Sequence, residues 1–135
     1  MSFSNTAETA VLNQVFVGTA LPWDANTNLY IALHTADPGE AGTATTSEAT
    51  YGGYARAVLT RASDFTVSGN LLSNANLEQF ATCTSGSNVI TYASIVDTAS
   101  GAGTIIVRAA LSSSITVSTG VQPQFAAGAL SFTLA

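Results

Sequence analysis

The residues of this chain that could carry out chemistry are few and widely separated. His34 is the only histidine and stands three residues before Asp37, so the two supply two of the three groups of a serine hydrolase triad. Serines are abundant, but none lies in a Gly-x-Ser-x-Gly turn that would expose a nucleophile. The eight carboxylates are scattered, and no spacing favours the facing pair of a glycosidase. We therefore predict that His34 hydrogen-bonds its own loop.

Metal ligands and activated nucleophiles are equally sparse. Zinc catalysis needs about three side-chain ligands, and one histidine and one cysteine in distant segments do not provide them. Asp37 and Glu40 share a loop that could bind calcium with backbone carbonyls, although a solvated turn is the simpler expectation. Cys83 lies between two threonines, which do not lower the pKa of a thiol, so we predict a small core residue. No catalytic residue, cofactor or metal site is predicted.

A glycine pair between two tyrosines could in principle belong to a phosphate-binding loop. Gly52 and Gly53 lack the lysine and the strand-to-helix context of a phosphate-binding loop. We expect them to permit a backbone turn between Tyr51 and Tyr54 instead.

One helix is predicted near the start of the chain, over residues 5–18. Asn5 is a suitable cap, Glu8 suits the positive helix end, and Gly18 is a plausible stop. A short helix must dock on something to persist, so we expect it to pack through an apolar stripe. That stripe consists of Val11, Leu12, Val15 and Phe16.

From residue 28 onward the chain has the pattern of a β protein. Leu29, Ile31 and Leu33 alternate with polar or small residues, which is typical of a strand, and a tight hairpin is predicted around residues 68–70. Further strands are expected over 55–61, 76–81, 89–96, 104–111, 114–117, 121–125 and 129–134. The prediction is a mainly β fold, an antiparallel β-sandwich or jelly roll of about eight short strands with one amino-terminal helix. We expect a single domain, 1–135, with the sandwich over 28–135.

The composition points to an assembly. Charged residues make up 8% of the chain, against about 25% in typical soluble domains, and there is no lysine. Hydroxyls and amides cost less to desolvate than ions, so a surface of this kind is easily buried. The net charge of −5 makes nucleic acid and anionic membranes poor partners. The first residues lack the basic region of a signal peptide, so we expect assembly in a cytoplasm.

The run from residue 28 to residue 61 carries a resemblance to known proteins. LYIALHTADPGEAGT at 29–43 followed by GYAR at 53–56 resembles a family of small tailed-bacteriophage virion proteins, loosely described as tail fibre-like or capsid-associated. The amino-terminal helix and PQFAAGAL at 123–130 add a weaker similarity. The resemblance implies a building block of the virion, assembled in the host cytoplasm, and implies no reaction.

Together these observations predict a non-enzymatic structural protein of a phage virion. We expect a capsid cement or decoration protein that braces the lattice of the major capsid protein. The alternatives are a tail or head fibre subunit involved in host attachment, and a carbohydrate-binding β-sandwich. We expect the chain to form a homo-oligomer, most simply a trimer.

Six residues are the candidates for contacts between subunits. Large aromatic side chains concentrate binding energy at interfaces, although simple core packing is an equally good expectation for them. With so few cations, each arginine is expected to pair with a carboxylate or to cross a subunit contact. The candidates are Trp23, Tyr51, Tyr54, Arg56, Arg61 and Arg108.

Overall fold

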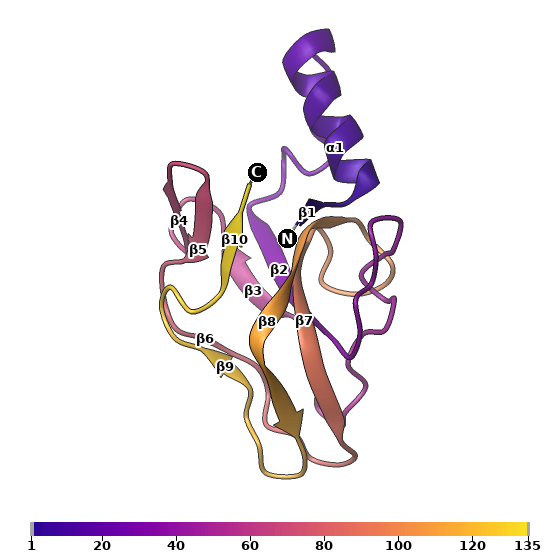
Figure 1. Ribbon diagram of the computed structural model, residues 1–135, viewed down its shortest axis with the longest axis vertical. Coiled ribbons are helices and arrows are strands. Elements are labelled where there is room, and N and C mark those ends of the chain that lie inside the picture. Colours follow the sequence, from indigo (N-terminus) through magenta and orange to yellow (C-terminus); the bar gives the residue numbers. More distant parts are fainter. Residues whose placement is uncertain (1, 135) are drawn as a thin grey trace.

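A computed structural model describes residues 2–134 of the chain, and these residues form one short helix and ten antiparallel strands (Figure 1). Strand β1 (Ser2–Phe3) precedes helix α1 (Asn5–Leu12), which continues as the π-helical segment η1 (Asn13–Val17). The other strands are β2 (Asn28–His34), β3 (Ala57–Thr60), β4 (Phe65–Ser68), β5 (Leu71–Asn74), β6 (Glu78–Gln79), β7 (Asn88–Val96), β8 (Ile105–Val117), β9 (Gln124–Phe125) and β10 (Ser131–Thr133).

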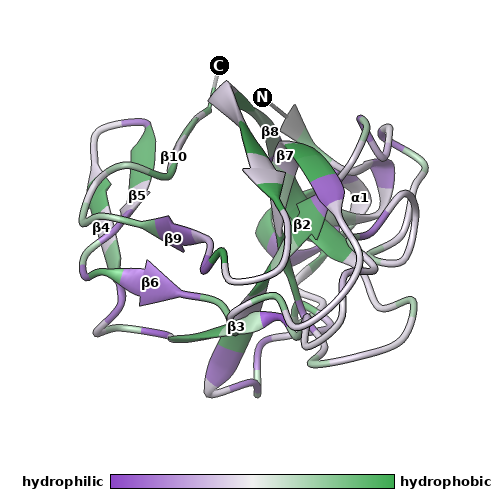
Figure 2. Ribbon diagram, turned by 90° about the horizontal axis from the view of Figure 1, so that it is seen from below, coloured by the Kyte–Doolittle hydropathy of each residue, from purple (hydrophilic) through white to green (hydrophobic). Residues whose placement is uncertain are grey.

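The strands form two layers with the main core between them. A five-stranded sheet has the order β1-β8-β7-β2-β3, and the opposite layer consists of the sheets β10-β5-β4 and β6-β9. Leu33 and Ile95 from the large sheet share one buried cluster with Phe80, Phe125 and Phe132 from the other layer. In Figure 2 the hydrophobic colour gathers on β2, β7 and β8, whereas β6 and β9 are mainly hydrophilic. The predicted mainly β, sandwich-like fold with one amino-terminal helix is confirmed.

Strand β2 is buried on both faces. Its alternating residues Leu29, Ile31 and Leu33 enter the main core, as the sequence pattern predicts. On the opposite face, Ala32 packs in a second, smaller cluster whose other members include Ala44 from the loop that follows β2. The loop over residues 35–56 therefore covers this face of the sheet.

The predicted strand limits agree with the structure at the tight hairpin and differ from it in several longer strands. The predicted hairpin at 68–70 is confirmed, with Gly69 at a φ of 62° between paired β4 and β5. By contrast, the two strands expected over 104–111 and 114–117 are one strand, β8. Its serines do interrupt the pairing, because the register with β7 shifts between Ile90 and Tyr92. The strands expected over 76–81 and 121–125 shorten to two residues each.

The helix begins one residue earlier than its sequence indicates. Ser4, not Asn5, is the cap, and its Oγ accepts a hydrogen bond from the Ala7 N–H at 3.1 Å. The same hydroxyl donates to the Ile105 carbonyl and so ties the helix start to β8. Gly18 ends the helical segment in the left-handed conformation at a φ of 77°, as predicted.

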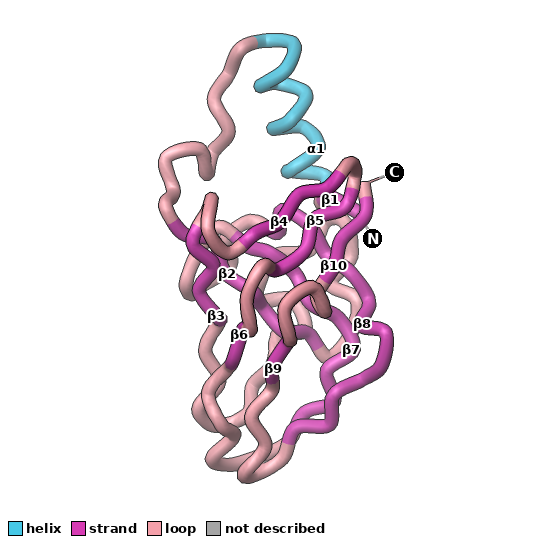
Figure 3. Tube along the Cα trace, turned by 90° about the vertical axis from the view of Figure 1, so that its left-hand side faces the viewer, coloured by secondary structure: helices cyan, strands magenta, loops and turns pink. Residues whose placement is uncertain are grey.

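The predicted packing of the helix through its apolar stripe is wrong for the single chain. Leu12, Val15 and Phe16 are 57%, 64% and 79% exposed, while the helix contacts the body through the small residue Ala7. The reason is that Ser4 fixes the first turn on β8, so the far end of the helix extends beyond the strands (Figure 3). None of the described helices is long and apolar enough to cross a membrane.

Two alanine substitutions test whether β2 is buried in the core while the apolar end of the helix is exposed. Leu33→Ala empties a fully buried position and should cost about 2–5 kcal/mol of unfolding free energy. Phe16→Ala removes an exposed ring and should change it by less than about 0.5 kcal/mol at protein concentrations where the chain is monomeric. Urea unfolding measures both values. Losses of equal size would show that the helix packs on its own chain in solution.

Candidate functional site

The 35–56 loop is held by a buried ion pair. Glu48 and Arg56 meet in a two-pronged contact, with Arg56 Nε 2.7 Å from Glu48 Oε1 and Arg56 Nη2 2.9 Å from Glu48 Oε2. The arginine side chain is 3% exposed and that of Glu48 is 14% exposed. Paired donors and acceptors of this geometry form the strongest class of ion pair in proteins. The sequence prediction that Arg56 pairs with a carboxylate is therefore confirmed.

The remaining donors of Arg56 reach a second loop, between β7 and β8. Nη1 donates to the carbonyl and the hydroxyl of Thr98, at 2.9 and 3.2 Å, and Nη2 also donates to the Gly101 carbonyl. These contacts, with the two to Glu48, use all five N–H groups of a guanidinium. One side chain thus joins two loops that are about 40 residues apart in sequence.

Tyr54 connects the ion pair to strand β2. Its hydroxyl donates to Glu48 Oε1 at 2.8 Å and accepts from the Leu33 N–H at 3.1 Å. Strand β3 pairs with β2 only from Asn28 to Ile31, so the Tyr54 hydroxyl bonds a β2 amide beyond the reach of β3. Burial raises the pKa of Tyr54 above its usual value, which keeps the donor protonated.

His34 lies beside this network and is fully buried. Its Nδ1 is 2.8 Å from the Thr46 carbonyl and its Nε2 is 2.7 Å from Ser94 Oγ. Because a carbonyl only accepts, Nδ1 carries the proton, and Nε2 accepts from the serine hydroxyl. The predicted bond from His34 to its own loop is confirmed, whereas Ser94 on β7 could not be found from sequence spacing.

The His34–Ser94 pair resembles the base and nucleophile of a hydrolase, but its surroundings oppose that use. Ser94 is fully buried, so no substrate reaches its hydroxyl. Asp37 does not orient the ring, because its carboxylate accepts from Arg108 Nε at 2.9 Å and from the Gly39 N–H at 2.8 Å. Burial lowers the pKa of His34 below its usual value, and the Thr46 carbonyl and Glu48 only partly oppose that effect.

The other predicted chemical residues take structural positions. Cys83 is buried and donates to the Ser85 carbonyl at 3.2 Å, which confirms a small core residue. Gly53 has a φ of 90° in the turn between Tyr51 and Tyr54, and a Cβ on Gly52 would stand 2.1 Å from Ser85 Oγ. Over residues 2–134, no group of three histidine, cysteine or carboxylate side chains is placed to hold a metal ion.

The aromatic interface candidates lie mostly inside the chain. Trp23 and Tyr51 are 5% and 3% exposed, so a partner would reach their rings only if the core opened. Tyr54 stacks on Phe80 with ring centroids 6.4 Å apart. Their predicted part in a subunit contact stays a prediction.

Arg61, the remaining interface candidate, binds carbonyl groups. Its Nη1 donates to the carbonyls of Trp23, Asp24 and Asn26 at 2.9–3.1 Å, and this fixes the segment that leads into β2. These three acceptors of Arg61 are backbone carbonyls, whereas Arg56 and Arg108 each contact a carboxylate.

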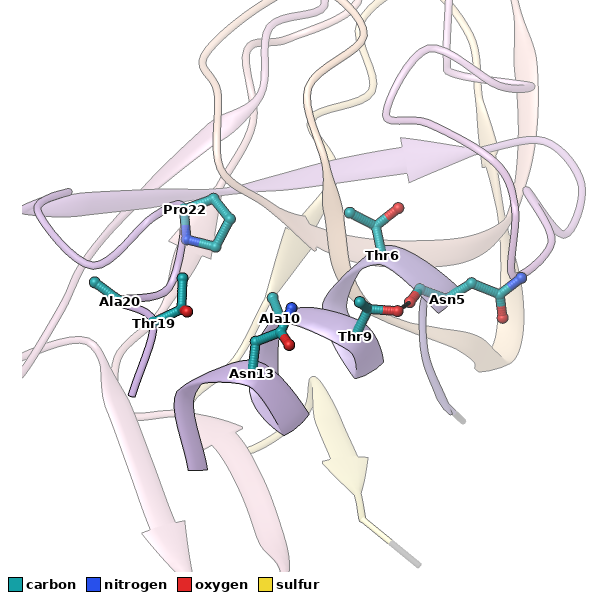
Figure 4. A pocket seen from close by; sticks show the side chains of 8 residues that line it. All are labelled: Asn5, Thr6, Thr9, Ala10, Asn13, Thr19, Ala20 and Pro22. Carbon is teal, nitrogen blue, oxygen red and sulfur yellow. Dashed lines mark hydrogen bonds between the residues drawn. The ribbon is translucent and has the colours of Figure 1, made fainter. Parts of the chain in front are cut away.

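Two exposed apolar surfaces lie toward the end of the molecule that carries the helix. The far end of the helical segment presents exposed Leu12, Val15, Phe16 and Val17. A hollow of about 450 Å³ separates the other side of the helix from residues 19–22 (Figure 4). An apolar groove of about 330 Å³ lies between the two layers of strands, with Leu72 and Phe132 among its walls. Neither hollow contains a set of polar groups suited to catalysis.

Comparison with known proteins gives the family. Over residues 2–133 the chain matches the family described as Podophage GP4 fiber I protein gp80. Because the match covers nearly the whole sequence, the chain belongs to this family. No curated protein matches the chain. The predicted resemblance to virion proteins of tailed phages and the predicted location in the virion are confirmed.

Removal of one member of the buried ion pair should be strongly destabilising. Arg56→Met leaves Glu48 buried without its partner and should cost about 3–5 kcal/mol of unfolding free energy. The matched control is Asp37→Asn, which breaks the more exposed pair with Arg108 and should cost less than about 1 kcal/mol. Chemical denaturation measures both. Equal losses of unfolding free energy in the two variants would show that the Glu48–Arg56 pair contributes no more to stability than the more exposed pair.

His34 should make the protein less stable in acid. Its folded pKa is lowered, so below about pH 6.5 the unfolded chain binds a proton that the folded chain resists. The free energy of unfolding should fall from pH 6.5 downward, by up to about 1.4 kcal/mol per pH unit from this group. His34→Gln should remove that part of the slope, and comparison of the two proteins cancels the other titrations. Identical slopes would contradict the prediction.

Proposed function

We propose that this protein, a member of a podophage fibre protein family, is a structural subunit of a virion fibre and works without catalysis. The observation that carries the proposal is the family match over residues 2–133. The inaccessible His34–Ser94 pair and the lack of a three-ligand metal cluster among the described residues are consistent with it.

The fibre reading replaces a capsid cement role as the better-supported one. Both readings require a charge-poor surface that is buried against other virion proteins, so composition does not separate them. The family description names a fibre protein, and nothing in the fold points to the capsid lattice in particular. A homo-oligomer, with a trimer as the simplest form, remains part of the proposal.

Direct carbohydrate binding is a weaker explanation of a role in attachment. Sugar recognition by stacking needs exposed aromatic faces, and the interface candidates Trp23 and Tyr51 are buried. We therefore expect this subunit to contribute to the architecture of the fibre and to contact other virion proteins.

The position of the protein in the particle tests the proposal. Antibodies against the purified chain should label fibres in electron micrographs of intact particles and leave the capsid shell unlabelled. Deletion of the gene should lower adsorption to host cells while DNA retention on heating stays at the wild-type level. Shell labelling together with normal adsorption and early loss of DNA would instead favour the cement role.

A further inference from the structure

The far end of the helical segment is an apolar surface without a partner in the chain. We define the helix tip as Leu12, Val15, Phe16 and Val17, which are 57%, 64%, 79% and 71% exposed. All four residues lie within the span 12–17 at the end of the helical segment, so their exposed side chains are close neighbours. The tip contains no charged residue, and contiguous exposed apolar surface of this kind marks an interaction site.

A receptive apolar surface exists on the same chain. We define the end groove as the 330 Å³ hollow between the five-stranded and three-stranded sheets. Its walls include Leu72, Ile106 and Phe132, and its lining also includes Val67 and Leu134, which are 73% and 44% exposed. Arg61 is the one charged residue that lines it, and this side chain already donates to backbone carbonyls.

The helix tip does not fill the end groove of its own chain. Its four side chains stay more than half exposed, and Ser4 fixes the start of the helix on β8. A different side of the helix, with Thr9 and Asn13, faces the hollow shared with residues 19–22 (Figure 4). Helix α1 and the β4–β5 hairpin that borders the groove lie toward the same end of the molecule (Figure 1).

The two surfaces are large enough together for a specific contact. The tip exposes on the order of 500 Å², given about 200 Å² for a whole aromatic side chain. Coverage of a matching area of the groove brings one contact to about 1,000 Å², near the lower bound for specific interfaces. A reciprocal exchange between two copies would bury about 2,000 Å², which is typical of stable dimers.

We propose that the helix tip of one copy occupies the end groove of a second copy. This inference deepens the proposed function, because it names the contact through which the fibre subunit forms its homo-oligomer. The tip and the groove are different surfaces, so the contact closes a ring, continues as an open filament, or is made reciprocally in a pair. A ring of three copies is the form that agrees with the expected trimer.

The charges of the chain favour a second copy over other partners. Membrane-binding amphipathic helices carry lysine or arginine on their polar face, whereas the only charged residue of this helix is Glu8. A nucleic acid partner would need clustered cations, which the helix lacks. A second copy requires no charge complementarity, and it supplies a groove of suitable size whose walls are mainly apolar.

Disulfide trapping between differently substituted chains is the first test. Phe16→Cys and Val67→Cys are made in separate full-length chains, mixed and oxidised; the native Cys83 is buried and stays in both. The mixture should give a disulfide-linked heterodimer on non-reducing gels. Thr9→Cys replaces Phe16→Cys as the matched control and should not link to Val67→Cys. Absence of the heterodimer, or an intramolecular bond in a chain with both substitutions, would overturn the proposal.

Disruption of the same contact is the second test, read as solution mass by light scattering. Wild type should have a multiple of 13.7 kDa, and Phe16→Asp and Val67→Asp should each reduce it to the single-chain mass. Gln14→Asp places the same charge on an exposed helix position outside the tip and should keep the oligomer. Circular dichroism checks the fold of each variant. A monomeric wild type at high micromolar concentration, or oligomers that survive Phe16→Asp, would refute the contact.

Particle incorporation separates the failure of this inference from failure of the proposed function. If Phe16→Asp chains are missing from particles although wild type is monomeric and unlinked, the tip binds a different virion protein and the second-copy proposal is wrong. The fibre proposal would survive that result, because it depends on where the protein is found in the particle.

Discussion

The buried pair of Glu48 and Arg56 is the interaction on which the rest of the structure depends. It places one guanidinium where three segments meet: the loop after β2, the loop between β7 and β8, and, through Tyr54, strand β2 at the Leu33 amide. Removal of either charge would leave the other buried without compensation, which makes the arrangement all-or-none. The second face of the large sheet is covered as a result, and His34 and Ala32 are sealed from water.

The use of the other cations follows the same logic. Arg61 secures the segment that enters β2 by binding three carbonyls, and Arg108 ties Asp37 to strand β8. All three arginines of the chain thus have bonding partners inside it. Apart from exposed carboxylates such as Glu8, Asp24 and Glu40, the outer surface consists mainly of hydroxyls, amides and apolar groups, which are less costly to desolvate than ions. Because its cations are used within the chain, such a subunit has few positive charges to desolvate when it is buried among other copies.

Local patterns predicted much of the fold. The alternation of Leu29, Ile31 and Leu33 marked β2, and Gly69 marked the β4–β5 turn, because period and turn chemistry depend on neighbours in sequence. The helix was predicted with nearly correct limits, but its apolar stripe was assigned to the core. Periodicity shows that such a stripe needs a partner and does not show whether that partner is in the same chain.

The site was harder to predict because its partners are distant in sequence. Arg56 was expected to find a carboxylate, yet nothing local singles out Glu48 among eight acidic residues, and the carbonyls of Thr98 and Gly101 leave no sequence signal. Ser94 was missed for the same reason, since it lies 60 residues from His34. The end groove is formed by strands of both layers, whose packing only the three-dimensional fold reveals.

The exposed apolar end of this molecule should become buried when copies assemble. Hydrogen–deuterium exchange of the free chain and of the oligomer measures this directly. Amides of residues 12–17 and of residues 67–72 should gain protection together on assembly, while those of the Arg56-bound loop at 97–104 should not change. Unchanged exchange at 12–17, or protection there without protection at 67–72, would contradict it.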